Sequence, residues 1–214
     1  MDFNKFLLAP EDCAVLFIDH QPQEYFGITS SSQQCIRNHV IGLAKATQVF
    51  KVPFVLTTIA QEKFNGPTVE LLAKALGNPQ SLNRSNINAW EDEKFVKAVK
   101  ATKRKKLVIT GLWTDLCCLL TAISAIHDDY EVFVVTDTCG STSPEAHERA
   151  IQRMIQAGVV PVTWLQVMME WQRDWTRKET AGPVRQIAME HAAPYGIGIE
   201  FNQQISQGLV TPEA

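Results

Sequence analysis

The stretch GLWTDLCCLL at residues 111–120 contains two adjacent cysteines, one of which could be a nucleophile. Cys117 falls in the first turn of a helix that Thr114 or Asp115 would cap, where unpaired backbone N–H groups and the helix dipole favour an anion. Such a position lowers a thiol pKa. Cys118 lies about 100° further around the helix, so only one thiol faces the strand end. Alternatively, both thiols fill the core, because free cysteine is often buried.

Carboxylates close two apolar runs of the chain. Asp19 ends CAVLFID and Asp137 ends EVFVVTD. In an open parallel sheet, ligands bind beyond the carboxyl ends of the strands. A carboxylate directly after apolar residues is costly to bury unless it is paired or functional. Asp19 is therefore a second candidate site residue, whereas for Asp137 a cap on the turn TDTCGS is favoured.

Strand and helix patterns alternate along the chain. Apolar runs indicate buried strands at residues 13–19, 53–59, 106–111, 131–137 and 159–164. Apolar residues at helical spacing predict helices at residues 36–50, 68–76, 92–102, 114–128 and 144–158. This βα order predicts a three-layer α/β fold, with a parallel sheet of five to six strands covered by helices on both faces.

The remaining parts of the chain define its organisation. Residues 60–91 form the long loop of the pattern, and loops of that length tend to carry function. From residue 165 the pattern becomes helical, and the last residues mix Gly, Pro and polar types without strong periodicity. We expect a main domain at residues 1–180 and a C-terminal helical or extended arm at residues 181–214.

The composition argues against polyanionic partners and a membrane. The 214 residues are 45% hydrophobic and carry a net charge of −3, which gives one sizeable core and no positive field for nucleic acid. The basic run at residues 103–106 is interpreted as a solvated helix end. No stretch approaches the ~20 apolar residues of a membrane span, and the N-terminus lacks a secretory pattern. A cytoplasmic protein is expected.

The cysteines and histidines lack the spacing of a disulfide framework or a metal site. The five cysteines are odd in number and contain no C-x-x-C pair, which predicts reduced thiols. The five histidines are scattered, so we expect no metal and no cofactor. His20 alternates away from Asp19 along the strand and is expected to be structural.

Several segments resemble, in matching order, the isochorismatase-like cysteine hydrolase superfamily, most closely its YcaC-like branch. The resemblance covers roughly residues 8–178 and implies an isochorismatase-like, Rossmann-like version of the three-layer fold. The segments are AVLFIDHQPQEYF, INAWEDEKFVKAVKAT, LVITGLWTDLCCLLTA, VFVVTDTCG and TWLQVMMEWQRDW.

The most specific matches concern two motifs. Asp19 is followed two residues later by Gln21, and the turn G-x-x-T-x-x-C contains Thr114 and Cys117. The resemblance places Cys117, not Cys118, at the family's nucleophile position.

Arg84 departs from the family pattern. The third catalytic residue of the family is a lysine, and the corresponding segment here is RSNINAW at residues 84–90. Either cation can stabilise a thiolate and keep Asp19 ionised, but a guanidinium is planar and does not give up its proton. If the role is electrostatic, Arg84 serves; if it needs proton transfer or a compact ammonium, activity is reduced or redirected.

The resemblance also implies a mechanism. Asp19 takes the thiol proton, Cys117 attacks a carbonyl carbon, and Asp19 returns the proton to the departing amine before activating water against the thioester. Arg84 stabilises the ionised states. The family's non-proline cis peptide maps onto Leu112–Trp113, and the backbone N–H groups of Trp113 and Cys117 correspond to the oxyanion hole.

Five residues in or beside these motifs are candidates for the pocket. Phe26 and Trp90 are equally consistent with the core. Nicotinamidase relatives carry an Asp-x-His cluster after the second strand, but the corresponding TTIAQEKFNG holds no histidine, in line with the absence of a metal. The candidate pocket residues are Gln21, Phe26, Trp90, Leu112 and Thr114.

The resemblance implies a hydrolase of a small amide or related C–N bond, with a small-molecule substrate and neither nucleic-acid nor membrane partners. The alternative, motivated by Arg84, is a non-catalytic oligomeric binding or scaffold protein whose site has decayed. Vinyl-ether hydrolysis is disfavoured because it does not need the cysteine. A homo-oligomer is also implied, often an octamer in the family, and the aromatic residues of WQRDW at residues 171–175 offer interface anchors.

Overall fold

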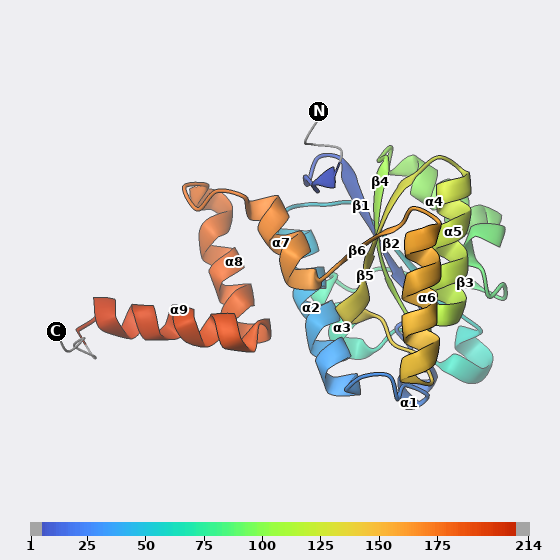
Figure 1. Cartoon of the computed structure of the whole chain (residues 1–214), viewed down its shortest axis with the longest axis horizontal. Helices are drawn as coiled ribbons and strands as arrows, with labels where there is room; N and C mark the ends of the chain where they lie inside the picture. Colours follow the sequence, from blue (N-terminus) through green and yellow to red (C-terminus); the bar gives the residue numbers. More distant parts are fainter. Residues whose placement is uncertain (1–5, 209–214) are drawn as a thin grey trace.

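A six-stranded parallel sheet forms the centre of the molecule (Figure 1). The structure is a computed structural model that describes residues 6–208. The strand order β3-β2-β1-β4-β5-β6 confirms the predicted α/β sheet. The strands are β1 (Cys13–Ile18), β2 (Phe54–Ile59), β3 (Leu82–Arg84), β4 (Lys106–Gly111), β5 (Glu131–Val135) and β6 (Val160–Val162).

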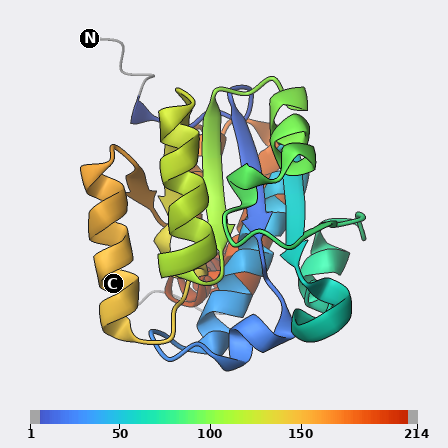
Figure 2. The same ribbon diagram turned by 90° about the vertical axis from the view of Figure 1, so that its right-hand side faces the viewer.

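Helices cover both faces of the sheet, as Figures 1 and 2 show. One face carries α2 (Gln33–Val49), α3 (Glu70–Ala75) and α7 (Trp164–Gln172). The opposite face carries α4 (Glu93–Ala101), α5 (Leu119–His127) and α6 (Pro144–Gln156). The three layers are therefore helix, sheet and helix, which confirms the predicted architecture.

The two cores are divided by the alternation of side chains along the central strands. In β1, Val15 and Phe17 pack into the core beneath α2 and α7, whereas Leu16 and Ile18 pack into the core beneath α4 and α5. Every residue of β1 is buried. A strand covered on both faces reads as a continuous apolar run, which is why this strand is visible in the sequence.

The interval expected as one long loop, residues 60–91, contains more structure than α3. It holds a π-helical turn η2 (Gln61–Asn65), the short strand β3 and a 3-10 turn η3 (Ala89–Glu91). Strand β3 has three residues, too few to show a period, and it pairs with β2 at the sheet edge.

The C-terminal region forms two further helices, α8 (Lys178–His191) and α9 (Ala193–Ser206). Buried residues recur at helical spacing along α8, which packs on α2 despite Pro183 inside the helix. The expected boundary between residues 180 and 181 falls inside this helix. No helix described between residues 6 and 208 has the length and apolar character that a bilayer crossing requires.

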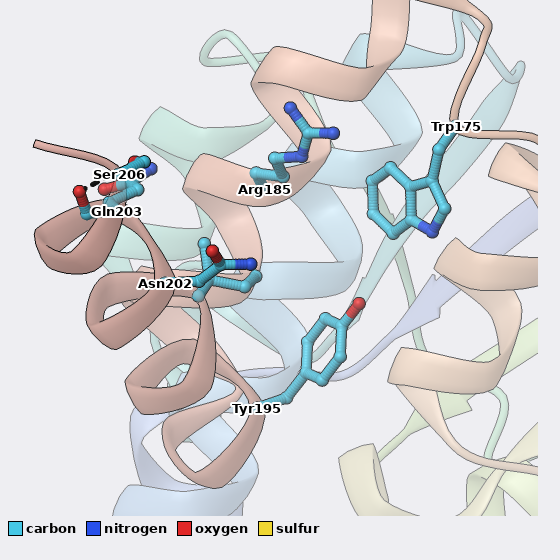
Figure 3. A pocket seen from close by; sticks show the side chains of 7 residues that line it. Trp175, Arg185, Tyr195, Asn202, Gln203 and Ser206 are labelled. Carbon is cyan, nitrogen blue, oxygen red and sulfur yellow. Dashed lines mark hydrogen bonds between the residues drawn. The ribbon is translucent and has the colours of Figure 1, made fainter. Parts of the chain in front are cut away.

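Helix α9 packs on α8 and extends away from the sheet (Figure 1). Gly196 allows this crossing, because a Cβ there would lie 2.8 Å from the carbonyl oxygen of Ala188. Figure 3 shows the hollow between the two helices, where Trp175, Arg185 and Tyr195 line a cavity of about 420 Å³. The hollow shares no residue with the predicted site.

Candidate active site

The two central strands, β1 and β4, place Asp19 and the Cys117 turn at the same end of the sheet. Ile18 pairs with Gly111, so the chain leaves both strands side by side. The connections from β1 and β4 continue to opposite sides of the sheet at this point, which is where open α/β sheets bind ligands. Asp19 has φ +53°, a left-handed conformation that costs energy in a non-glycine residue and that turns the chain away from the strand.

A bidentate ion pair joins Asp19 to Arg84. Arg84 ends β3 opposite Ile59 of β2, and its side chain reaches across β2 to the end of β1. Its Nη1 donates to Asp19 Oδ1 at 2.6 Å and its Nη2 donates to Asp19 Oδ2 at 2.7 Å. Both side chains are essentially inaccessible, at 1% and 0% exposure. Paired charges are the form in which a buried arginine and carboxylate are tolerated.

Two further acceptors fix the orientation of the guanidinium. Arg84 Nη1 donates to Thr57 Oγ1 at 3.3 Å, and Nη2 donates to the carbonyl oxygen of Ile87 at 3.2 Å. The planar fork is thus held on the carboxylate by bonds from β2 and from the segment after β3. Such a pair depends on arginine geometry, which a lysine does not reproduce.

Cys117 completes the group. It lies in the π-helical turn η4 (Thr114–Cys118), directly after the peptide bond Leu112–Trp113, which is cis. Its thiol interacts with the Asp19 carboxyl group and lowers the pKa of that group, and the residue is 6% exposed. Cys118 lies in the core instead, with its Sγ 3.8 Å from the Sγ of Cys139. The structure therefore brings together Asp19, Arg84 and Cys117.

The protonation of Cys117 differs from the sequence-based expectation. Burial raises the pKa of the thiol, and the charge and hydrogen bond of Asp19 raise it further, whereas Arg84 lowers it. The expected lowering by the helix end is therefore wrong. A raised pKa means that the resting sulfur is held as a thiol rather than as a thiolate.

Asp19 is suited to receive that proton. Burial raises the pKa of its carboxyl group, while the hydrogen bonds and charge of Arg84 and the bond from Cys117 work in the opposite direction. A carboxylate with a raised pKa is a stronger base than one on the surface. Burial lowers the pKa of the Arg84 guanidinium, but the hydrogen bonds and charge of Asp19 raise it by more. The net pKa is raised, so Arg84 stays charged.

The predicted oxyanion donors lie in the same turn. Within residues 6–208 the backbone N–H of Trp113 has no hydrogen-bond acceptor. The carbonyl group of Trp113 accepts from Cys118 N at 3.2 Å, which ties this peptide to the nucleophile turn. The oxyanion role of Trp113 and Cys117 stays a prediction.

Two of the predicted pocket residues near β1 have other surroundings. Gln21 is fully buried, and its amide is used by backbone: Nε2 donates to Ile59 O and Gly66 O, and Oε1 accepts from Ile59 N. Phe26 is 73% exposed and lines a surface hollow that does not include Cys117. Gln21 thus holds the loop after β2 in position. A pocket role for Gln21 and Phe26 stays a prediction.

The other predicted pocket residues also have partners within the protomer, and their pocket role stays a prediction. Trp90 packs edge-on against two aromatic rings, and its Nε1 donates to Asp128 Oδ2 at 2.9 Å. Leu112 is fully buried in a small apolar cluster, and Thr114 Oγ1 is 2.9 Å from His147 Nδ1. An aromatic or apolar residue type does not reveal which way its side chain points, so sequence alone could not separate core from pocket.

Two residues near Asp19 and Cys117, Glu24 and Asn65, were not predicted from the sequence. Glu24 lies in the short helix α1 (Pro22–Phe26), whose backbone is tied to the nucleophile turn because Trp113 Nε1 donates to Glu24 O at 2.8 Å. Burial and the charge of Asp19 raise the pKa of Glu24 to about 7, while Asn65 and Arg84 lower it. The sequence feature that could have identified Glu24 is an acidic residue three positions after Gln21. No sequence feature identifies Asn65.

His20 is buried and structural, as expected. Its ring nitrogens lie 3.2 Å from Tyr25 Oη and 3.0 Å from Thr110 Oγ1, and burial lowers its pKa to about 3. Among residues 6–208, no group of three His, Cys, Asp or Glu side chains is arranged to hold a metal ion.

Fold and site together define a class of protein. The isochorismatase domain family model matches residues 13–166, and the chain belongs to the isochorismatase family of hydrolases. Within the family it falls in the YcaC-like branch. It is 40% identical over 169 residues to the probable hydrolase YcaC of Escherichia coli. The aligned region covers 78% of this chain and 81% of that protein.

Two solved structures of the same branch superpose closely. YcaC from Pseudomonas aeruginosa, determined with hexane-2,5-diol and covalent acrylamide, has a TM-score of 0.86 at 35% identity and covers 92% of this chain and 96% of its own. E. coli YcaC, described as an octameric hydrolase of unknown specificity, has a TM-score of 0.87 at 34% identity. The match covers 94% of this chain and 97% of the E. coli chain.

Proposed function

We propose that this protein hydrolyses a small amide or related C–N bond through a thioester on Cys117. The observation that carries the proposal is one carboxylate, Asp19, held by Arg84 and accepting the Cys117 thiol at the switch point of the sheet. A nucleophile with an adjacent base, and a third group orienting that base, is the usual arrangement for covalent catalysis.

The steps follow from these contacts. The thiol proton passes to Asp19 as sulfur attacks the carbonyl carbon, and the oxygen gains the negative charge. When the C–N bond breaks, Asp19 gives the proton to nitrogen and a thioester is left on Cys117. Water then attacks the thioester and loses a proton to Asp19; this proton returns to sulfur as the carboxylic acid leaves. Arg84 keeps its charge throughout.

Covalent acrylamide on P. aeruginosa YcaC supports a nucleophile that accepts small carboxamides in this branch. The alternative, a binding or scaffold protein with a decayed site, was motivated by Arg84 in place of lysine. The bidentate pair argues against decay, because both Nη atoms are in use and the fork is additionally fixed by Thr57 and Ile87.

The test is to map acrylamide adducts by peptide mass spectrometry. We expect Cys117 to react and Cys118, buried beside Cys139, to stay unmodified. Cys35 is exposed and will also react, so the experiment uses a Cys35→Ser background. In it, Cys117→Ser should remove the adduct and Cys118→Ser, the matched control, should keep it. An adduct that persists on Cys118 in the Cys117→Ser variant would contradict the proposal.

We also propose a homo-oligomer, with the octamer of E. coli YcaC as the expected form and the arm of α8 and α9 as part of the interface. Large apolar side chains on this arm, among them Ile197 at 65% and Phe201 at 51% exposure, have little cover within one protomer. Light scattering of the full chain at micromolar concentration should show a mass several times 23.9 kDa. A monomer would reject this part.

A further inference from the structure

Glu24 carries a surplus negative charge beside the proposed nucleophile. In the ion pair, the Arg84 fork is taken up by both oxygens of Asp19, so the group of two carboxylates and one guanidinium is one positive charge short. Within residues 6–208, Glu24 takes part in no salt bridge. Its effect on the pKa of Cys117 shows that its charge is felt at the sulfur.

Asn65 adds an unsatisfied acceptor at the same place. The Asn65 side chain lowers the pKa of Glu24, so its amide interacts with this carboxyl group. Its Oδ1 is buried without a partner, and the residue is 5% exposed. Buried acceptors without partners are rare and call for a donor from outside the chain.

The fold holds this pair in place. Gln21 Nε2 bonds Gly66 O at 2.5 Å and so fixes the end of η2, which carries Asn65. Trp113 Nε1 bonds the Glu24 carbonyl and so fixes α1 to the turn that carries Cys117. These bonds hold α1 and the end of η2 against each other and beside the turn that carries Cys117.

We propose that Glu24 and Asn65 form the specificity subsite for a cationic N–H donor, so that the substrate is a small amide that also carries an ammonium or amidinium group. The inference rests on the proposed cysteine chemistry. A cation supplies the missing positive charge, and its N–H groups satisfy both Glu24 and Asn65 Oδ1. A neutral N–H donor could hydrogen-bond to the same oxygens but would leave the charge of Glu24 uncompensated, and an anion would be repelled by it.

The test compares two acrylamides of equal length, cationic N-(2-aminoethyl)acrylamide and neutral N-propylacrylamide. The ratio of their alkylation rates is measured at Cys117 and divided by the ratio at exposed Cys35 in the same molecule, which cancels their intrinsic reactivity. We expect a preference of about tenfold for the cation at pH 8. It should fall below pH 7, where Glu24 is protonated.

Glu24→Gln should bring the normalised ratio to about one, because the variant is isosteric and uncharged. Glu62→Gln removes an exposed carboxylate from η2 and is the matched control, expected to keep the preference. A ratio that is the same in the wild type and Glu24→Gln overturns the subsite while leaving the nucleophile intact. No adduct at Cys117 with either reagent overturns the proposed function and the subsite with it.

A second measurement tests the surplus charge without any reaction. Burial raises the pKa of Glu24 from 4.5 to about 7, so the folded protein holds this proton more tightly than the unfolded chain does. The contribution of Glu24 to stability therefore falls as pH rises from 4.5 through about 7. Glu24→Gln should be more stable to urea than the wild type at pH 8 and show no gain at pH 4. A variant less stable at pH 8 would overturn the premise.

Discussion

Asp19→Asn is expected to lower amide hydrolysis by about 10²–10⁴-fold while making Cys117 easier to alkylate at neutral pH. The change removes the group that accepts the thiol proton and returns it to the leaving nitrogen. It also removes the charge and hydrogen bond that raise the pKa of Cys117, whereas Arg84 continues to lower that pKa. Turnover and thiol ionisation therefore change in opposite directions.

The measurement is the rate of iodoacetamide alkylation at Cys117 between pH 6 and 10, beside hydrolysis of an amide found by screening. In the wild type the alkylation rate should still rise above pH ~8.5, where free cysteine levels off. In Asp19→Asn the profile should move to lower pH, and alkylation of Cys35 in the same sample provides the reference. An unchanged profile for Cys117 would show that Asp19 does not control its proton.

Arg84→Met is expected to destabilise the protein by about 3–5 kcal/mol near neutral pH and to abolish activity. It leaves the carboxylate of Asp19, which is 0% exposed, without its cation. Since Arg84 lowers the pKa of Asp19, its loss raises that pKa further above the unfolded value. The folded variant then binds its proton more tightly than the unfolded chain, so its deficit grows from pH 5 to pH 8.

Urea unfolding at the two pH values measures this effect. Arg84→Lys is the conservative control; it keeps a charge but not the fork, and should lose less stability than Arg84→Met. The double variant Asp19→Asn/Arg84→Met removes both charges and should recover most of the loss, because replacing a whole buried pair is often close to neutral. Additive losses in the double variant would mean that the pair contributes no coupling.

The parts of the site that follow long apolar strands were predictable. Asp19 follows β1 and the turn of Cys117 follows β4; both strands are buried on two faces, so their ends are marked in the sequence. Arg84 was identified through the family resemblance, since its strand has only three residues. The resemblance also implied that it acts on Asp19, but the bidentate pairing across β2 could only be seen in the fold.

Properties that depend on side-chain direction were not predictable. The pKa of Cys117 is raised by burial and then by a carboxylate nearly one hundred positions away in the chain, neither of which the local helix pattern reveals. Phe26 turns to the surface and Trp90 turns to Asp128, although both stand within matched segments. The segment of α8 was predicted only as a helical or extended arm, because glycine and proline obscured its buried positions.

Cys117 and the two side chains beside it follow or end the strands β1, β3 and β4, so no continuous segment of the chain contains the site. Bringing these strand ends together requires long chain loops to close, which is a late and slow part of folding. We therefore expect Cys117 to come under the influence of Asp19 and Arg84 only after the last of these strands has docked. The proposed catalytic arrangement exists only in the finished topology.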